Sequence, residues 1–162
     1  MTRLTLYSGA LMMASMSATA AMAHNYDARD VAARTANELV VTLDNIAEEA
    51  TELSEAAARR GHNYDAKTLA DLADSSAGLA ARIDQRLLLP LEHDATLAFA
   101  RAQLARLAMD FDLFEDDVAA VDHVNRYLAV EIEDARELKY DLEVALNASD
   151  RGRPGRDVTI PR

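Results

Sequence analysis

The chain has 162 residues, no cysteine, and 28 acidic against 17 basic side chains, which gives a formal net charge of −11 at pH 7. The absence of cysteine excludes disulfides, thiolate nucleophiles, thiolate metal sites and anchoring through a lipid-modified cysteine. A chain this acidic repels the phosphates of nucleic acids, so we expect no nucleic-acid partner.

The first 23 residues have the features of a secretory signal peptide. Arg3 supplies a positive start, a mostly apolar stretch covers residues 4–16, and small residues lead to an Ala-x-Ala step at 21–23. The apolar stretch is too short to span a bilayer as a stable helix, and no second stretch approaches that length. An uncleaved membrane anchor is the alternative interpretation of this segment. We expect cleavage, which leaves a periplasmic or secreted mature protein that begins at His24 and has no transmembrane helix.

Residues 24–150 are predicted to form one all-α domain of long helices. This stretch contains only two glycines and one proline, Gly61, Gly78 and Pro90, so few residues interrupt helical structure. Apolar residues recur three and four positions apart in four successive stretches, which is the pattern of a helix with one buried face. Gly61, after two arginines, predicts the end of the first helix. The seam of that helix is Ala32, Ala36, Leu39, Leu43, Ile46, Ala50, Leu53 and Ala57.

Three further stretches repeat the pattern. The second is predicted to stop near Leu88, because Pro90 disfavours a helical conformation in the residue before it. No glycine or proline separates the third from the fourth, and one helix over 94–148 would be about 80 Å long. We therefore expect a turn within 109–117, where four aspartates offer caps. The principal seam residues are Leu69, Leu72, Ser76, Leu79, Ile83 and Leu87, then Leu97, Leu104, Leu107, Phe111 and Phe114, then Leu128, Ile132, Leu138 and Leu142.

The expected fold is an antiparallel four-helix bundle, and three long helices are the alternative if the last two stretches fuse. Residues 151–162 contain four arginines, two glycines, two prolines and one aspartate. This composition predicts a disordered basic tail whose arginines rest on the acidic bundle.

The pentapeptide His-Asn-Tyr-Asp-Ala occurs twice, at 24–28 and at 62–66. The interpretation we favour is structural. Asp27 and Asp65 act as helix N-caps, and the tyrosine before each forms a hydrophobic staple with the first turn. A shorter version at 93–95 precedes the third stretch. This interpretation explains the tyrosine and the aspartate but not the recurrence of histidine and asparagine.

The histidines favour an alternative, a divalent-metal site. In an up-down bundle, two of them fall near one end and two near the other. A free amino terminus at His24 supplies an amine and an imidazole, a pair that suits copper, and zinc is the second candidate metal. Aspartates near the same helix ends supply carboxylates, with Asp65 and Asp116 as further possibilities. The candidate ligands are His24, His62, His93, His123, Asp94 and Asp122.

The sequence lacks the common catalytic and cofactor patterns. It has no Glu-x-x-His of a di-iron bundle, no His-Glu-x-x-His of a zinc protease, no haem-attachment motif and no glycine-rich phosphate loop. The acidic run 110–117 has no turn glycine and places Phe114 where a calcium loop needs an oxygen ligand. We therefore expect no catalytic residues and no enzymatic activity.

The predicted function is that of an exported, acidic helical-bundle binding protein. It would engage another protein or self-associate through its heptad faces. Metal handling with copper or zinc is the second hypothesis, and an enzyme of unknown type is the third. The run Ser75-Ser76-Ala77-Gly78 predicts close helix packing, with a groove for an apolar ligand as the alternative. Phe99 lies off its seam and is predicted to face a partner or the other side of the bundle.

Overall fold

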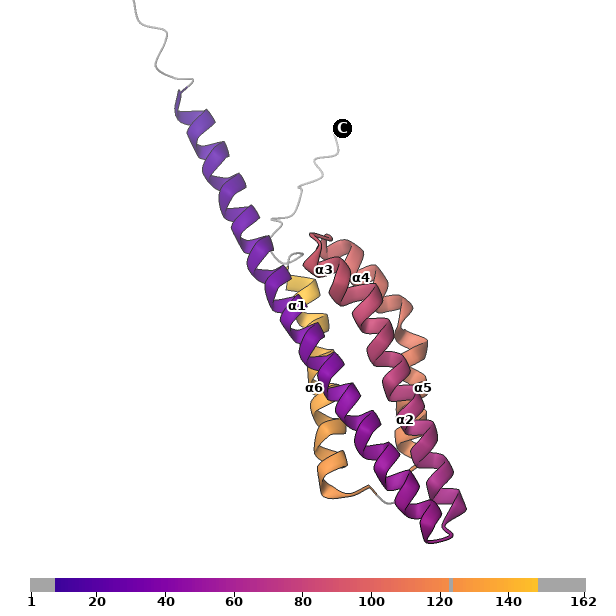
Figure 1. Cartoon of the computed structure of the whole chain (residues 1–162). Helices are drawn as coiled ribbons and strands as arrows, with labels where there is room; N and C mark the ends of the chain where they lie inside the picture. Colours follow the sequence, from indigo (N-terminus) through magenta and orange to yellow (C-terminus); the bar gives the residue numbers. More distant parts are fainter. Residues whose placement is uncertain (1–7, 123, 149–162) are drawn as a thin grey trace, which may run out of the picture.

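The computed structural model describes residues 8–122 and 124–148, with side chains described from Ala28 onward. The described residues contain helices and no strand, which confirms the all-α prediction (Figure 1). The predicted leader has no described side chains, and the predicted tail 151–162 lies outside the described residues. In chain order the elements are α1 (Ser8–Arg59), α2 (Asn63–Ile83), the π-helix η1 (Asp84–Leu88), α3 (Leu89–Glu92), α4 (Leu97–Arg106), α5 (Ala108–Ala120) and α6 (Arg126–Asn147).

The helices pack as a bundle around α1 and α2. α1 packs on both α2 and α6, α2 also packs on α5, and α4 lies against α6. α1 has 52 residues, which corresponds to about 78 Å. Its N-terminal part extends beyond the other helices in Figure 1. α1 therefore has two neighbouring helices, α2 and α6. The helices α4 and α5 complete the bundle and approach α6.

The predicted seams form the core. In α1, the residues Leu39, Leu43 and Ile46 are completely buried, and in α2 the same holds for Leu72 and Leu79. Burial of a leucine or isoleucine side chain contributes about 1.5–3 kcal/mol. Since the seams are buried within a single chain, the heptad faces themselves are not free to bind a partner. A docking surface has to be sought on the outer faces of the helices.

The end of α1 agrees with the sequence prediction. α1 ends at Arg59, and Gly61 has a φ of +80°, the left-handed conformation that glycine adopts without strain. The Gly61 N–H donates to the carbonyl of Ala58, and the His62 N–H donates to that of Ala57, both at 3.0 Å. This is a Schellman motif, which satisfies the last carbonyls of the helix.

The second helical stretch does not stop near Leu88, and that prediction is wrong. Helical structure continues through Pro90 to Glu92 by way of η1. A proline has no N–H and clashes with the carbonyl four residues before it in a regular α-helix. In η1 the turn is wider, and the Leu89 N–H donates to the carbonyl of Asp84. The same change of register places Leu87, Leu88 and Leu91 together in the core.

The predicted turn within 109–117 is also wrong. Residues 108–120 form α5, so the aspartates of this run are helical rather than caps. Only a kink at Leu107 separates α4 from α5, and the chain turns between Val121 and Asn125. Asn125 is the N-cap of α6, and its Oδ1 accepts a hydrogen bond from the Leu128 N–H at 2.7 Å.

Three predicted helix starts are corrected as well. Asp27 lies inside α1, because the alanine- and methionine-rich residues before it favour helix and continue it upstream in the full chain. The N-cap of α2 is His62, so Asp65 is its third residue, and Tyr64 is too exposed, at 67%, to form a staple. α4 is capped by Thr96, whose Oγ1 accepts from the Phe99 N–H at 3.2 Å. Asp94 instead takes the turn with a φ of +67°.

Candidate functional site

The predicted metal ligands lie at the two ends of the bundle. His93 and Asp94 follow α3 at one end, where the carboxylate of Asp94 pairs with the guanidinium of Arg29 on α1. Residue 24 lies five positions before Arg29 on the same helix, and its side chain lies outside the described residues. Five helical residues correspond to about 7.5 Å along the helix axis.

His62 and Asp122 lie at the opposite end, in the turns after α1 and after α5 (Figure 1). The imidazole of His62 has its Nδ1 3.5 Å from an oxygen of Asp65. His123 lies outside the described residues. Among the side chains that the structure describes, no group of three or more His, Cys, Asp or Glu residues is arranged to hold a metal ion. The metal site stays a prediction that depends on His24 and His123.

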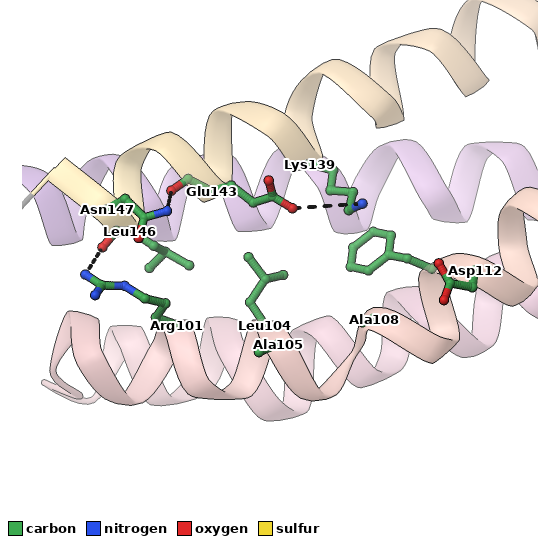
Figure 2. Close-up of a pocket in the computed structure, with 10 residues that line it drawn as sticks. Arg101, Leu104, Ala105, Ala108, Asp112, Lys139, Glu143, Leu146 and Asn147 are labelled. Carbon is green, nitrogen blue, oxygen red and sulfur yellow. Dashed lines mark hydrogen bonds and ion pairs between the residues drawn. The ribbon is translucent and has the colours of Figure 1, made fainter.

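The structure does contain a groove, which opens between the α4–α5 pair and α6 (Figure 2). It encloses about 250 Å³. Its floor is apolar and its rim is polar, with two basic and two acidic side chains. The floor residues are Leu104, Ala105, Ala108, Phe111 and Leu146, and the rim residues are Arg101, Asp112, Lys139, Glu143 and Asn147.

The two basic side chains of the rim are held by contacts between the helices that they join. Arg101 of α4 donates from Nη2 to the carbonyl of Leu146 at 2.8 Å, which caps the end of α6. Lys139 of α6 places its Nζ 5.0 Å from the centre of the Phe111 ring, a cation–π distance, and 3.9 Å from Glu143. In Figure 2, Arg101 and Lys139 lie toward opposite ends of the groove, with Leu104 between them. They therefore define the length of the groove.

A shallow acidic hollow lies on α6. It is lined by Glu133, Arg136, Glu137, Tyr140 and Asp141. Arg136 is engaged there, since its Nη2 lies 2.6 Å from Oε2 of Glu115 on α5. This hydrogen bond lowers the pKa of the Glu115 carboxyl below its usual range. Glu137 and Asp141 form no ion pair with the described residues, so the hollow keeps a net negative charge.

The outer face of α4 and α5 carries large exposed apolar side chains. Met109 is 83% exposed, Leu113 50% and Phe99 45%. The sequence prediction that Phe99 lies off the buried seam is confirmed. Residues 95–109 contain no acidic side chain, although the chain as a whole is acidic. Arg106, on the same face, forms no ion pair with the residues that the structure describes.

The small-residue run in α2 serves packing and one ion pair. Ser75 and Ser76 are buried, and each hydroxyl donates to the carbonyl of Leu72, at 3.1 and 2.7 Å. A Cβ at Gly78 would lie 3.2 Å from Nη2 of Arg82. The glycine therefore leaves room for the Arg82 side chain, whose Nε lies 3.1 Å from an oxygen of Asp110 on α5.

The groove residues were not predicted from the sequence, because the groove depends on how far α6 lies from α4 and α5. One local signal was available. The stretch 95–109 combines three consecutive helical turns without an acid, two arginines and a bulky residue off the seam. In a chain with this net negative charge, such a stretch indicates a surface that is less acidic and more apolar than the rest.

No protein-family model matches the chain, and no curated protein or solved structure matches it either. The described helices include none with an apolar stretch of the length and hydropathy required to cross a membrane.

Proposed function

We propose that this chain is an exported, non-catalytic binding protein built as an antiparallel four-helix bundle. In this proposal, residues 1–23 are removed as a signal peptide, 24–150 form the bundle and 151–162 form a basic tail. The outer face of α4 and α5 binds an acidic amphipathic segment of another protein. We call this surface the α4–α5 face and define it by Phe99, Arg106, Met109 and Leu113.

The observation that carries the proposal is the exposure of three large apolar side chains on this face, led by Met109 at 83%. Single exposed apolar residues are ordinary. Here the three residues follow one side of a kinked helical pair at intervals that suit a second helix, 99, 109 and 113. Burial of these side chains by a partner would contribute favourable free energy at about 25 cal/mol per Å².

Charge favours an acidic partner over a second copy of the chain. The α4–α5 face has Arg106 near its centre, at the end of the acid-free stretch 95–109, and the acidic run 110–117 follows it. A two-fold antiparallel pairing of two such faces would be centred at residue 106 and would bring the two arginines opposite each other, which costs free energy. A carboxylate on a different protein would pair with Arg106 instead.

Site-specific photo-crosslinking in cells that export the protein tests the proposal. A photoreactive amino acid replaces Met109 in one variant and Val41 in the control. Val41 is also apolar and exposed, at 52%, but lies on α1 among acidic side chains. We expect a specific crosslinked product from position 109 and not from 41, and mass spectrometry should place the crosslink in an acidic helical segment of another protein.

Two outcomes contradict the proposal. A crosslink from 109 to a second copy of the chain would indicate self-association. Equal labelling from 109 and 41 would show that the α4–α5 face has no preferred partner.

Charge reversal at Arg106 gives a further measure, because Arg106→Glu should weaken the crosslink from 109 while it leaves helicity unchanged.

Metal handling remains the second candidate, favoured by one specific contact. The ion pair between Arg29 and Asp94 fixes this part of α1 against the turn that contains His93. A mature chain that begins at His24 would then carry its amine and imidazole close to a second imidazole, a donor set that suits copper or zinc. Calorimetric titration of copper and of zinc into protein with this authentic terminus is the test. Submicromolar affinity that is lost in His24→Ala and reduced in His93→Ala would support it, and an absence of binding would exclude it.

A further inference from the structure

We propose that the C-terminal tail, residues 151–162, folds back into the groove between α4–α5 and α6 of its own chain. The tail would then be an intramolecular ligand that any other ligand of the groove has to displace. The proposal concerns the groove and not the α4–α5 face, so either can fail without the other.

The position of the groove at the end of α6 is the first argument. Leu146 and Asn147 line it, and the described part of the chain ends one residue later, at Ala148. Fourteen residues follow, and an extended chain of that length reaches about 46 Å. The groove extends back along α6 to Lys139, which is about 12 Å of helix. A tethered segment this close to its site has an effective concentration in the millimolar range.

Charge complementarity is the second argument. Formal side-chain charges give the tail a net +3 and residues 24–150 a net −15. Glu143 and Asp112 on the rim, and Glu137 and Asp141 in the neighbouring acidic hollow, are exposed carboxylates within reach of the tail arginines. The basic side chains of the rim oppose this attraction weakly, because Arg101 and Lys139 are engaged with α6 and with Phe111.

The apolar content of the tail matches the floor of the groove. Val158 and Ile160 are separated by one residue, so an extended segment presents both side chains on the same side. Pro161 is compatible with that extended conformation. The floor offers Leu104 and Leu146 as apolar contacts, and a volume of about 250 Å³ is large enough for two aliphatic side chains. The arginines thus attach the tail to the acidic surface, and Val158 and Ile160 fill the groove.

The chain has no cysteine, so disulfide trapping reports only on the introduced pair. In the test variant, Ala108→Cys in the groove is combined with Ile160→Cys in the tail. Ala108 is exposed and lines the groove, which makes its replacement tolerable for folding. The matched control combines Ile160→Cys with Val41→Cys, an exposed position on α1. We expect the 108–160 disulfide to form at least ten times faster than the 41–160 disulfide, and at a rate independent of protein concentration.

The contrary results are distinct. Equal rates for the two pairs would overturn the proposal, because the tail would then sample the surface without preference. Mainly intermolecular disulfides at 108, with a rate proportional to concentration, would also overturn it, because the occupant would be the tail of another molecule.

Binding in trans gives a second measurement that does not depend on disulfide geometry. A synthetic peptide of residues 151–162 with an N-terminal fluorophore is titrated into protein that ends at Ala148, and anisotropy is recorded. We expect saturable binding that is at least five times weaker for the peptide with Ile160→Asp and for protein with Ala108→Glu. Binding that is unchanged by both substitutions but abolished by salt would overturn the groove as the site and leave only charge attraction to the bundle.

Discussion

Two interfaces of the bundle are built from different side chains, the one between α1 and α2 and the one between α4–α5 and α6. The helices lie closer together at the first interface than at the second. The buried residues of α1 and α2 include many alanines and two serines, which permit the close approach of the C-terminal part of α1 to α2. Across the second interface the contacts come from long or bulky side chains, above all Arg101, Phe111 and Lys139. The first interface is closed, and the second leaves a groove.

The comparison indicates that different helices of this acidic chain serve stability and binding. Small seam residues let α1 and α2 pack closely, and the side chains buried between them stabilise the fold. The packing of α4 and α5 against α6 leaves a groove, and the outer face of α4 and α5 carries the exposed side chains of Phe99, Met109 and Leu113. We therefore expect substitutions to affect stability in the first region and ligand occupancy in the second, and the predictions below test that division.

The largest effect is expected at Leu43, which is completely buried in α1. Leu43→Ala should reduce the free energy of unfolding by about 2–5 kcal/mol, because it leaves an enclosed cavity. The matched substitution is Leu104→Ala on the floor of the groove, where the space left behind is open to solvent and closes more easily. Urea denaturation followed by circular dichroism measures both. Equal losses would contradict the distinction between a closed and an open interface.

A smaller effect is expected at Ser76, which is completely buried in α2. Ser76→Leu inserts a large side chain where the helices lie close, and such overpacking costs about 1–3 kcal/mol. Ala77→Leu, one residue farther along α2, is the control because Ala77 is exposed, and it should change stability by less than about 0.5 kcal/mol. A tolerated leucine at position 76 would show that the interface has more room than the structure indicates.

Gly78→Ala tests two opposed effects. Alanine stabilises a helix relative to glycine by about 1 kcal/mol, but the new Cβ would lie 3.2 Å from Nη2 of Arg82 and displace it from Asp110. Partly exposed ion pairs of this kind contribute about 0.2–1 kcal/mol. We expect a net gain smaller than the full helix propensity in the native background.

The control removes the conflict. In an Arg82→Met background the ion pair is already absent, so Gly78→Ala should give the full gain of about 1 kcal/mol. Thermal and urea denaturation of the four proteins complete the double-mutant cycle. Identical gains in both backgrounds would show that Gly78 is not needed to accommodate the Arg82 side chain.

Features that depend on interactions between residues close in sequence could be predicted, and features that depend on contacts between distant segments could not. The helical stripes, the end of α1 at Arg59 and the exposure of Phe99 depend on local spacing, and the sequence predicted them. The continuation of helix through Pro90 depends on a π-turn whose hydrogen bonds skip one residue, and propensity alone does not indicate that choice. The aspartates of 110–117 are typical capping residues, but they lie inside α5, and Asn125 caps the next helix, α6. The groove depends on contacts between separate helices, for which a single sequence has no local signal.

The smallest expected effect concerns the ion pair that joins α5 to α6. The hydrogen bond from Arg136 lowers the pKa of Glu115, so this interaction stabilises the fold above the usual glutamate pKa of about 4.3 and is lost as pH falls below it. The side chains are 42% and 44% exposed, so solvent screening limits the contribution to below about 1 kcal/mol. Arg136→Gln should therefore lower stability slightly at pH 7 and hardly at all near pH 3.

Arg106→Gln is the control for that measurement, since Arg106 forms no ion pair with the described residues and its replacement should not add a step near the pKa of glutamate. Urea denaturation at several pH values between 3 and 7 measures both variants. If Arg136→Gln destabilises the chain equally at pH 3 and pH 7, packing of the arginine stem rather than its charge joins the two helices. In that case the open interface would resemble the closed one more than the structure suggests, and the acidic hollow beside the groove would lose its importance for holding α6 in place.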